Sequence, residues 1–117
     1  SLPDLFHSLC LEPRERAAAD YLRGMGASGL GVEAAARTAA VLSTGAEGAI
    51  PLKEGYAAAM AAQNTSYACV EKNIRSMVGK LQAGACGEYQ ALMGGLPAER
   101  PSNELFLRRL ARRILEW

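Results

Sequence analysis

The sequence predicts an all-α fold, a compact bundle of about six helices. Apolar residues make up 50% of the 117 positions, aromatic residues only 6%, and alanine is abundant. Runs of β-branched residues are nearly absent, and no segment alternates apolar and polar residues as a half-buried strand would. The length suits one hydrophobic core, so we expect a single domain over residues 1–117.

The N-terminal part predicts three helices. Apolar residues recur at helical spacing over residues 5–13, 13–25 and 32–42. Pro13 is expected to end the first helix, because proline lacks the N–H group that continues a helix. Glycines after the second helix and the turn-forming residues 43–48 end the other two. Within the third helix, Glu33 and Arg37 are spaced to form an ion pair one turn apart.

The remaining residues predict three further helices. Pro51 suits the first turn of a helix that runs to about residue 62. A helix over residues 66–82 follows, and the glycines within residues 83–87 suit its end. Residues 88–101 are expected to form a short helical piece and an irregular loop. Ser102 or Asn103 then caps the last helix, which runs to the C-terminus.

Residues 56–81 are predicted to form a helix-turn-helix. Only Gln63, Asn64 and Thr65 join the two helices, and so short a join forces them to cross at a sharp angle. Asn64 stands where the turn needs a positive φ, which asparagine tolerates better than most residues. Thr65 or Ser66 can then cap the second helix.

The second of these helices has two distinct faces. One face is apolar and is expected to be buried; it carries Val70, Ile74, Met77, Val78 and Leu81. The opposite face carries Ala68, Glu71, Lys72, Arg75 and Gly79. Lysine and arginine can bind guanine edges or phosphates, and glutamate can accept a hydrogen bond from the cytosine amino group. This face therefore fits a DNA major groove, and an ordinary solvated helix face is the alternative that periodicity alone leaves open.

Residues 64–75 resemble the recognition region of a known family. They read Asn-Thr-Ser-Tyr-Ala-Cys-Val-Glu-Lys-Asn-Ile-Arg. This pattern is similar to the C-terminal effector domain of the sporulation-initiation master response regulator, the stage zero sporulation protein A family. Further matches stand in the same order along the chain, at His7, Pro13, Tyr21, Leu22, Arg23, Tyr56, Pro101, Ser102, Asn103, Phe106 and Ala111.

The resemblance implies a six-helix effector domain of a transcription factor in two-component signalling that controls sporulation. Its partners would be double-stranded DNA, an N-terminal receiver domain in the full-length protein, and a second copy as a homodimer or in tandem on the DNA. The residues expected at the DNA are Thr65, Ser66, Ala68, Cys69, Glu71, Lys72, Arg75 and Lys80.

Several positions depart from the family pattern. Lys72 replaces an arginine, which weakens base reading because lysine is a single point donor and not a planar fork. Ala68 and Cys69 stand where serine and arginine are common, and Ala61 and Ala62 stand where lysines are common. These changes favour an alternative of another class, a helical protein-interaction module that has lost DNA recognition.

The last helix carries a group of arginines. Arg108, Arg109, Arg112 and Arg113 lie opposite an apolar face formed by Leu107, Leu110, Ala111 and Ile114. Two interpretations stand beside each other here. The arginines contact phosphates or a protein partner, or they form the solvated face of a core helix.

The sequence lacks the patterns that are typical of enzymes, of disulfide-rich proteins and of membrane-spanning proteins. No nucleophile with a base, no paired carboxylates and no phosphate-binding glycine loop is evident, so we expect no enzymatic activity and no cofactor. Cys10, Cys69 and Cys86 have no metal-ligand spacing, and their odd number fits a reducing cytoplasm better than a disulfide framework. No stretch approaches 18 uninterrupted apolar residues, so no membrane partner is expected.

Overall fold

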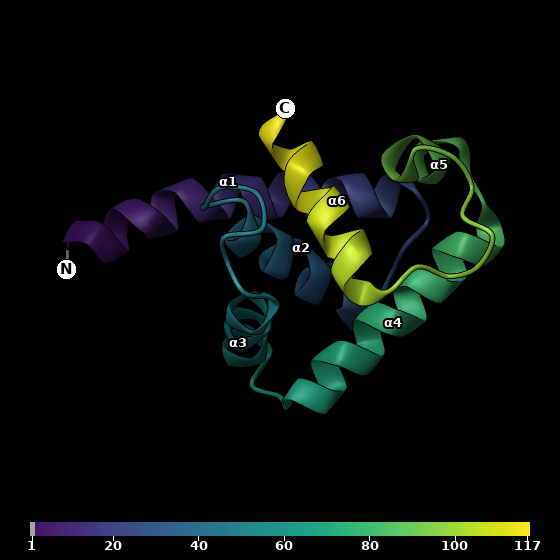
Figure 1. Ribbon diagram of the computed structural model, residues 1–117. Helices are drawn as coiled ribbons and strands as arrows, with labels where there is room; N and C mark the ends of the chain where they lie inside the picture. The colour runs from purple at the N-terminus through teal and green to yellow at the C-terminus, as the bar shows by residue number, and fades with distance from the viewer. Residues whose placement is uncertain (1) are drawn as a thin grey trace.

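Helices make up the fold throughout (Figure 1). The computed structural model describes the backbone of residues 2–117 and the side chains from residue 11 onward. Over that range the structure has no strand and six helices: α1 (Leu2–Gly24), α2 (Leu30–Leu42), α3 (Leu52–Gln63), α4 (Tyr67–Gly84), α5 (Gly87–Met93) and α6 (Asn103–Leu115). The predicted all-α bundle is confirmed. The side chains of His7 and Cys10 lie outside the described residues.

The first helix, α1, is continuous, so the break predicted at Pro13 is wrong. Proline removes one main-chain hydrogen bond, but its fixed φ is close to the helical value. After Pro13, the side chains of Ala18 and Leu22 are buried in the core, and this packing holds the helix. The structure still has six helices over residues 2–117, because the short helical piece predicted within residues 88–101 is α5.

The second helix, α2, lies at the centre of the bundle and contacts α1, α3, α4 and α6. Most of its buried side chains are small; Ala34, Ala35, Ala36, Ala39 and Ala40 are among them. Two glycines mark its closest approaches to its neighbours. A Cβ atom on Gly55 of α3 would lie 2.7 Å from Cγ2 of Thr38, and one on Gly31 would lie 2.5 Å from the main-chain oxygen of Asn73 in α4. These glycines therefore set the spacing of α3 and α4 from α2.

The apolar faces predicted for α4 and α6 are confirmed. The buried residues of α4 are Val70, Ile74, Met77, Val78 and Leu81. The predicted core residues of α6, Leu107, Leu110, Ala111 and Ile114, are buried as well. These faces pack α4 against α2, α3 and α6. One side of α4 is consequently held by the bundle and the opposite side is left outside.

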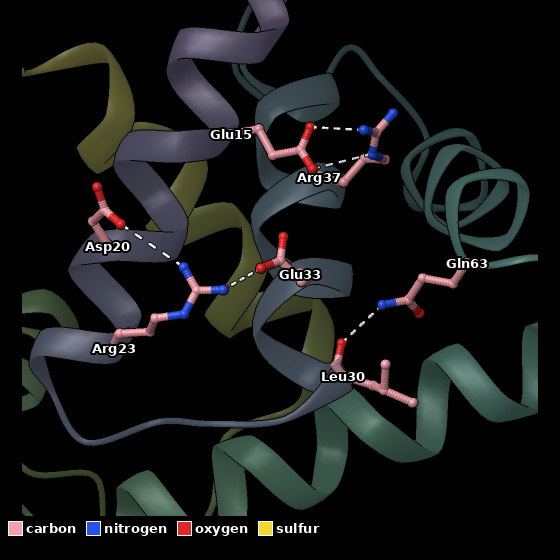
Figure 2. Close-up of polar contacts among 7 residues, drawn as sticks. All are labelled: Glu15, Asp20, Arg23, Leu30, Glu33, Arg37 and Gln63. Atoms are coloured by element: carbon pink, nitrogen blue, oxygen red, sulfur yellow. Dashed lines mark hydrogen bonds and ion pairs between the residues drawn. The ribbon is translucent and has the colours of Figure 1, made fainter.

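Ion pairs connect α1 to α2 (Figure 2). The pair predicted between Glu33 and Arg37 is wrong, because each side chain binds α1 instead. Arg37 contacts Glu15 through two nitrogens, with Nη2 3.0 Å and Nε 3.2 Å from the carboxylate oxygens. Arg23 contacts Glu33 and lies 3.8 Å from Asp20. Spacing within one helix does not show these partners, because they come from a neighbouring helix.

The C-cap of helix α4 is Ala85, which has left-handed backbone angles of φ 51° and ψ 39°. The predicted end within residues 83–87 is confirmed, but neither Gly84 nor Gly87 takes the left-handed conformation. Gly84 is the last helical residue, and the residue after it takes the left-handed conformation. For a residue with a Cβ atom this conformation costs about 1 kcal/mol or more of conformational free energy, whereas glycine adopts it without that cost.

We expect Ala85→Gly to raise the free energy of unfolding by about 0.5–1 kcal/mol, because the strain at the helix end is removed. Urea denaturation measures this change. Ala83→Gly is the matched control, since Ala83 is an exposed position inside the same helix. There the same substitution should lower the free energy of unfolding by about 1 kcal/mol. Equal destabilisation by both variants would contradict the strain at Ala85.

Candidate nucleic-acid interface

A three-residue turn joins α3 to α4. Asn64 has the predicted positive φ, with φ 50° and ψ 54°, and its N–H donates to the main-chain oxygen of Met60. Ser66 is the N-cap of α4, because its Oγ accepts a hydrogen bond from the N–H of Cys69 at 3.2 Å. In Figure 1 α3 is seen nearly end-on while α4 runs lengthwise. The chain therefore bends sharply between the two helices.

A strip of α4 faces away from the bundle. We call it the outer strip; its members are Ala68, Lys72, Arg75, Ser76 and Lys80. All five residues are exposed, and each lies three or four positions from another member, which places them on one side of the helix. That side lies opposite the buried apolar face. Of the face predicted from the sequence, Glu71 and Gly79 are half-buried and the remaining residues are exposed.

Glu71 and Arg75 bind each other on α4. Nη1 of Arg75 lies 2.6 Å from both carboxylate oxygens of Glu71. The main-chain oxygen of Glu71 also accepts a hydrogen bond from Nδ2 of Asn103, at 3.0 Å. An exposed pair one turn apart is worth only a few tenths of a kcal/mol, so a ligand of either side chain can open it.

Two further residues predicted at the DNA, Thr65 and Cys69, are half-buried beside the outer strip. The N–H of Thr65 donates to the main-chain oxygen of Met60 at 3.1 Å. Sγ of Cys69 lies 3.8 Å from Nδ2 of Asn73. The turn thus holds Thr65 by its main chain and leaves its side chain partly accessible.

The start of α4 rests on a pair of tyrosines. The ring of exposed Tyr67 meets the ring of buried Tyr56 edge to face, with 5.2 Å between their centroids. The hydroxyl of Tyr56 accepts a hydrogen bond from Nδ2 of Asn103 at 3.2 Å. Burial raises the pKa of Tyr56 above its ordinary value, and the hydrogen bond from Asn103 partly opposes that rise. Tyr56 is therefore an uncharged support that connects α3 and α6 to the start of α4.

The four arginines of α6 contact two different parts of the chain. On one side, Arg108 donates to the main-chain oxygen of Ile50 at 3.2 Å, and Nη1 of Arg112 lies 3.9 Å from Glu47. On the other side, Arg113 donates to the main-chain oxygen of Ala91 in α5 at 3.2 Å. Arg109 lies beside α5 as well, near Gly94. These contacts lead to the α2–α3 connection and to α5, so the structure does not gather the four arginines with the cations of α4.

Arg100 is a candidate that the sequence did not single out. It is exposed on the connection between α5 and α6, and its Cδ would lie 3.5 Å from a Cβ atom on Gly79 of α4. The connection is held there because Nε2 of Gln82 donates to the main-chain oxygen of Pro97 at 2.7 Å. Arg100 therefore adds a cation along the flank of the outer strip. No spacing within one helix could have predicted it, because it belongs to a loop.

A groove of about 380 Å³ lies on the other flank of α4. The α1–α2 connection, residues 25–29, forms one wall, and Asn73, Ser76 and Lys80 of α4 are part of the other. Gly31, just after residues 25–29, packs so closely on Asn73 that there is no room for a side chain, and this contact sets the distance between the two walls. Lys80 and Ser76 thus belong both to the groove and to the outer strip.

Comparisons with protein-family models, with curated proteins and with solved structures found no match for this chain. Within the described residues, no three histidine, cysteine, aspartate or glutamate side chains come together to hold a metal ion. None of the helices described over residues 2–117 is long and apolar enough to cross a membrane.

Proposed function

We propose that this chain is a sequence-specific DNA-binding effector domain of a response-regulator-type transcription factor, which places α4 in the major groove of the duplex. One observation carries the proposal. The outer strip of α4 is exposed along its length and directly follows the sharp three-residue turn after α3. A helix held in this way presents side chains to base edges while the helix before it crosses the DNA backbone.

The residues of α4 divide into different contacts. Lys72 and Arg75 would bind guanine edges or phosphates, and small Ala68 leaves room for a thymine methyl group. Thr65 and Ser66, at the start of the helix, would meet the DNA backbone together with Lys80. Cys69 lies at the edge of this contact area. Glu71 is available to a cytosine amino group only when Arg75 leaves it for the DNA, since the two bind each other in the free protein.

The resemblance to the stage zero sporulation protein A family supports a wider biological setting. In that setting a receiver domain precedes this chain in a cytoplasmic protein of two-component signalling. The chain then binds repeated DNA sites as a homodimer or as tandem copies, without a cofactor. We propose this setting from residues 64–75 and from the matches spread along the chain.

Selection of binding sites from a pool of random duplexes tests the proposed function. We expect an enriched motif and an affinity that falls steeply with salt, because lysine and arginine contacts release counterions from the phosphates. Recovery without any enriched motif would contradict sequence-specific binding. The same result would favour the second candidate.

The second candidate is a helical protein-interaction module. Ala61 and Ala62 favour it, because both are exposed on α3 and neither offers a cation to the DNA backbone. The helix α6 adds no cation to the interface on α4, since Arg108 and Arg113 donate to main-chain oxygens of the protein itself. DNA binding is favoured by four cations that lie along α4 and its flank: Lys72, Arg75, Lys80 and Arg100.

A further inference from the structure

Two connections lie on opposite flanks of α4. Asn73, Ser76, Lys80 and Gly84 face the α1–α2 connection across the groove. Gly79 and Gln82 face the α5–α6 connection, residues 94–102, through Arg100 and Pro97. In Figure 1 the α5–α6 connection passes in front of α4, whereas the α1–α2 connection approaches it from behind. The outer strip lies between these two flanks.

Each flank carries a cation. On the α1–α2 side, Lys80 stands at the groove together with the hydroxyl-bearing residues Ser28 and Ser76. On the α5–α6 side, exposed Arg100 lies against Gly79, where the missing side chain brings the arginine close to the helix. Lys72 lies on the strip between them. Lys72 thus has a cation on either side: Lys80 at the edge of the strip that borders the groove, and Arg100 on the side of the α5–α6 connection.

A major groove has a matching arrangement. Its floor presents base edges, and a phosphodiester strand borders it on each side. A helix that lies in the groove turns its two flanks toward opposite strands. We propose that Lys80, with Ser28, binds a phosphate of one DNA strand in the groove of the protein, and that Arg100 binds a phosphate of the opposite strand. This inference rests on the proposed function and specifies how the duplex is held.

Both connections are fixed before any DNA arrives. Gly31 packs directly on Asn73, and Nε2 of Gln63 donates to the main-chain oxygen of Leu30 at 3.0 Å, as Figure 2 shows. On the other flank, Gln82 binds Pro97 and also accepts a hydrogen bond from the hydroxyl of buried Tyr89 at 2.6 Å. Little loop ordering is therefore needed when the phosphates bind.

The test uses Lys80→Gln and Arg100→Gln, two exposed positions where the change removes the charge and keeps the fold. The duplex is the best site from the selection, and the salt dependence of binding is measured for each protein. We expect each variant to reduce the slope of log K against log salt by about 0.9, and the double variant to reduce it by about twice as much. Arg112→Gln removes the charge of an exposed side chain on α6 that lies near Glu47; it is the matched control and should leave the slope unchanged.

Neutral methylphosphonate linkages placed on one strand at a time then locate the two contacts. In the parent protein, neutral linkages at a contacted phosphate should weaken duplex binding. We expect linkages on one strand to have no such effect on Lys80→Gln, and linkages on the opposite strand to have none on Arg100→Gln. Unchanged salt slopes would overturn the inference, and so would loss of the linkage effect on the same strand in both variants. An enriched motif from the selection would still support the proposed function in either case. If the parent protein bound no duplex, the proposed function and this inference would both fail.

Discussion

Replacing Gly31 with alanine is expected to lower the free energy of unfolding by about 2 kcal/mol. A Cβ atom at this position would lie 2.5 Å from the main-chain oxygen of Asn73 and 3.1 Å from Cβ of Met77. A main-chain atom inside a helix cannot move aside alone, so α2 and α4 must separate. The helix-forming preference of alanine offsets only about 1 kcal/mol of this overpacking. Urea denaturation, followed by circular dichroism, measures the change.

Gly24→Ala is the matched control for this prediction. Gly24 ends α1, and no atom of another part of the chain lies within 4 Å of the place where its Cβ would stand. The control should therefore keep the parent's stability or gain a few tenths of a kcal/mol. If Gly31→Ala and Gly24→Ala were equally stable, the close contact between α2 and α4 would not be a constraint on the fold.

Arg75→Ala is expected to weaken binding to the selected duplex by about 10- to 100-fold, the value of one good bidentate hydrogen-bond contact to a base. Arg75 lies on the outer strip, and its partner in the free protein is Glu71, one turn away. Loss of this arginine leaves the Glu71 carboxylate facing the DNA without a counter-charge, which adds repulsion to the lost contact. Titration of a labelled duplex at fixed salt measures the effect.

Two controls separate this effect from a loss of folding. The Arg75–Glu71 pair is exposed, so its removal should change the free energy of unfolding by less than about 0.5 kcal/mol. Arg112→Ala removes an exposed arginine from α6 and should leave DNA affinity close to that of the parent. If Arg75→Ala bound the duplex as tightly as the parent at matched salt, Arg75 would have no role at the DNA.

Much of α4 could be predicted from the sequence alone. The buried face with Val70 and Ile74, a cap at Thr65 or Ser66 and the left-handed turn at Asn64 all follow from rules within a few residues of the chain, and the structure places the cap at Ser66. Helical periodicity acts over one turn, and capping acts over three residues. The exposure of Lys72 and Arg75 could therefore be stated before any neighbour of α4 was known.

The rest of the fold and of the candidate site depended on which helices lie next to one another. Glu33 and Arg37 find partners on α1 instead of each other, and α1 continues through Pro13. Arg100 reaches the flank of α4 from a loop, and Lys80 shares a groove with residues 25–29, more than fifty positions earlier in the chain. The sequence determined which side of each helix is apolar, because that property is local. Only the tertiary structure decided what lies beside each polar side, because helix packing brings together residues whose separation along the chain carries no such information.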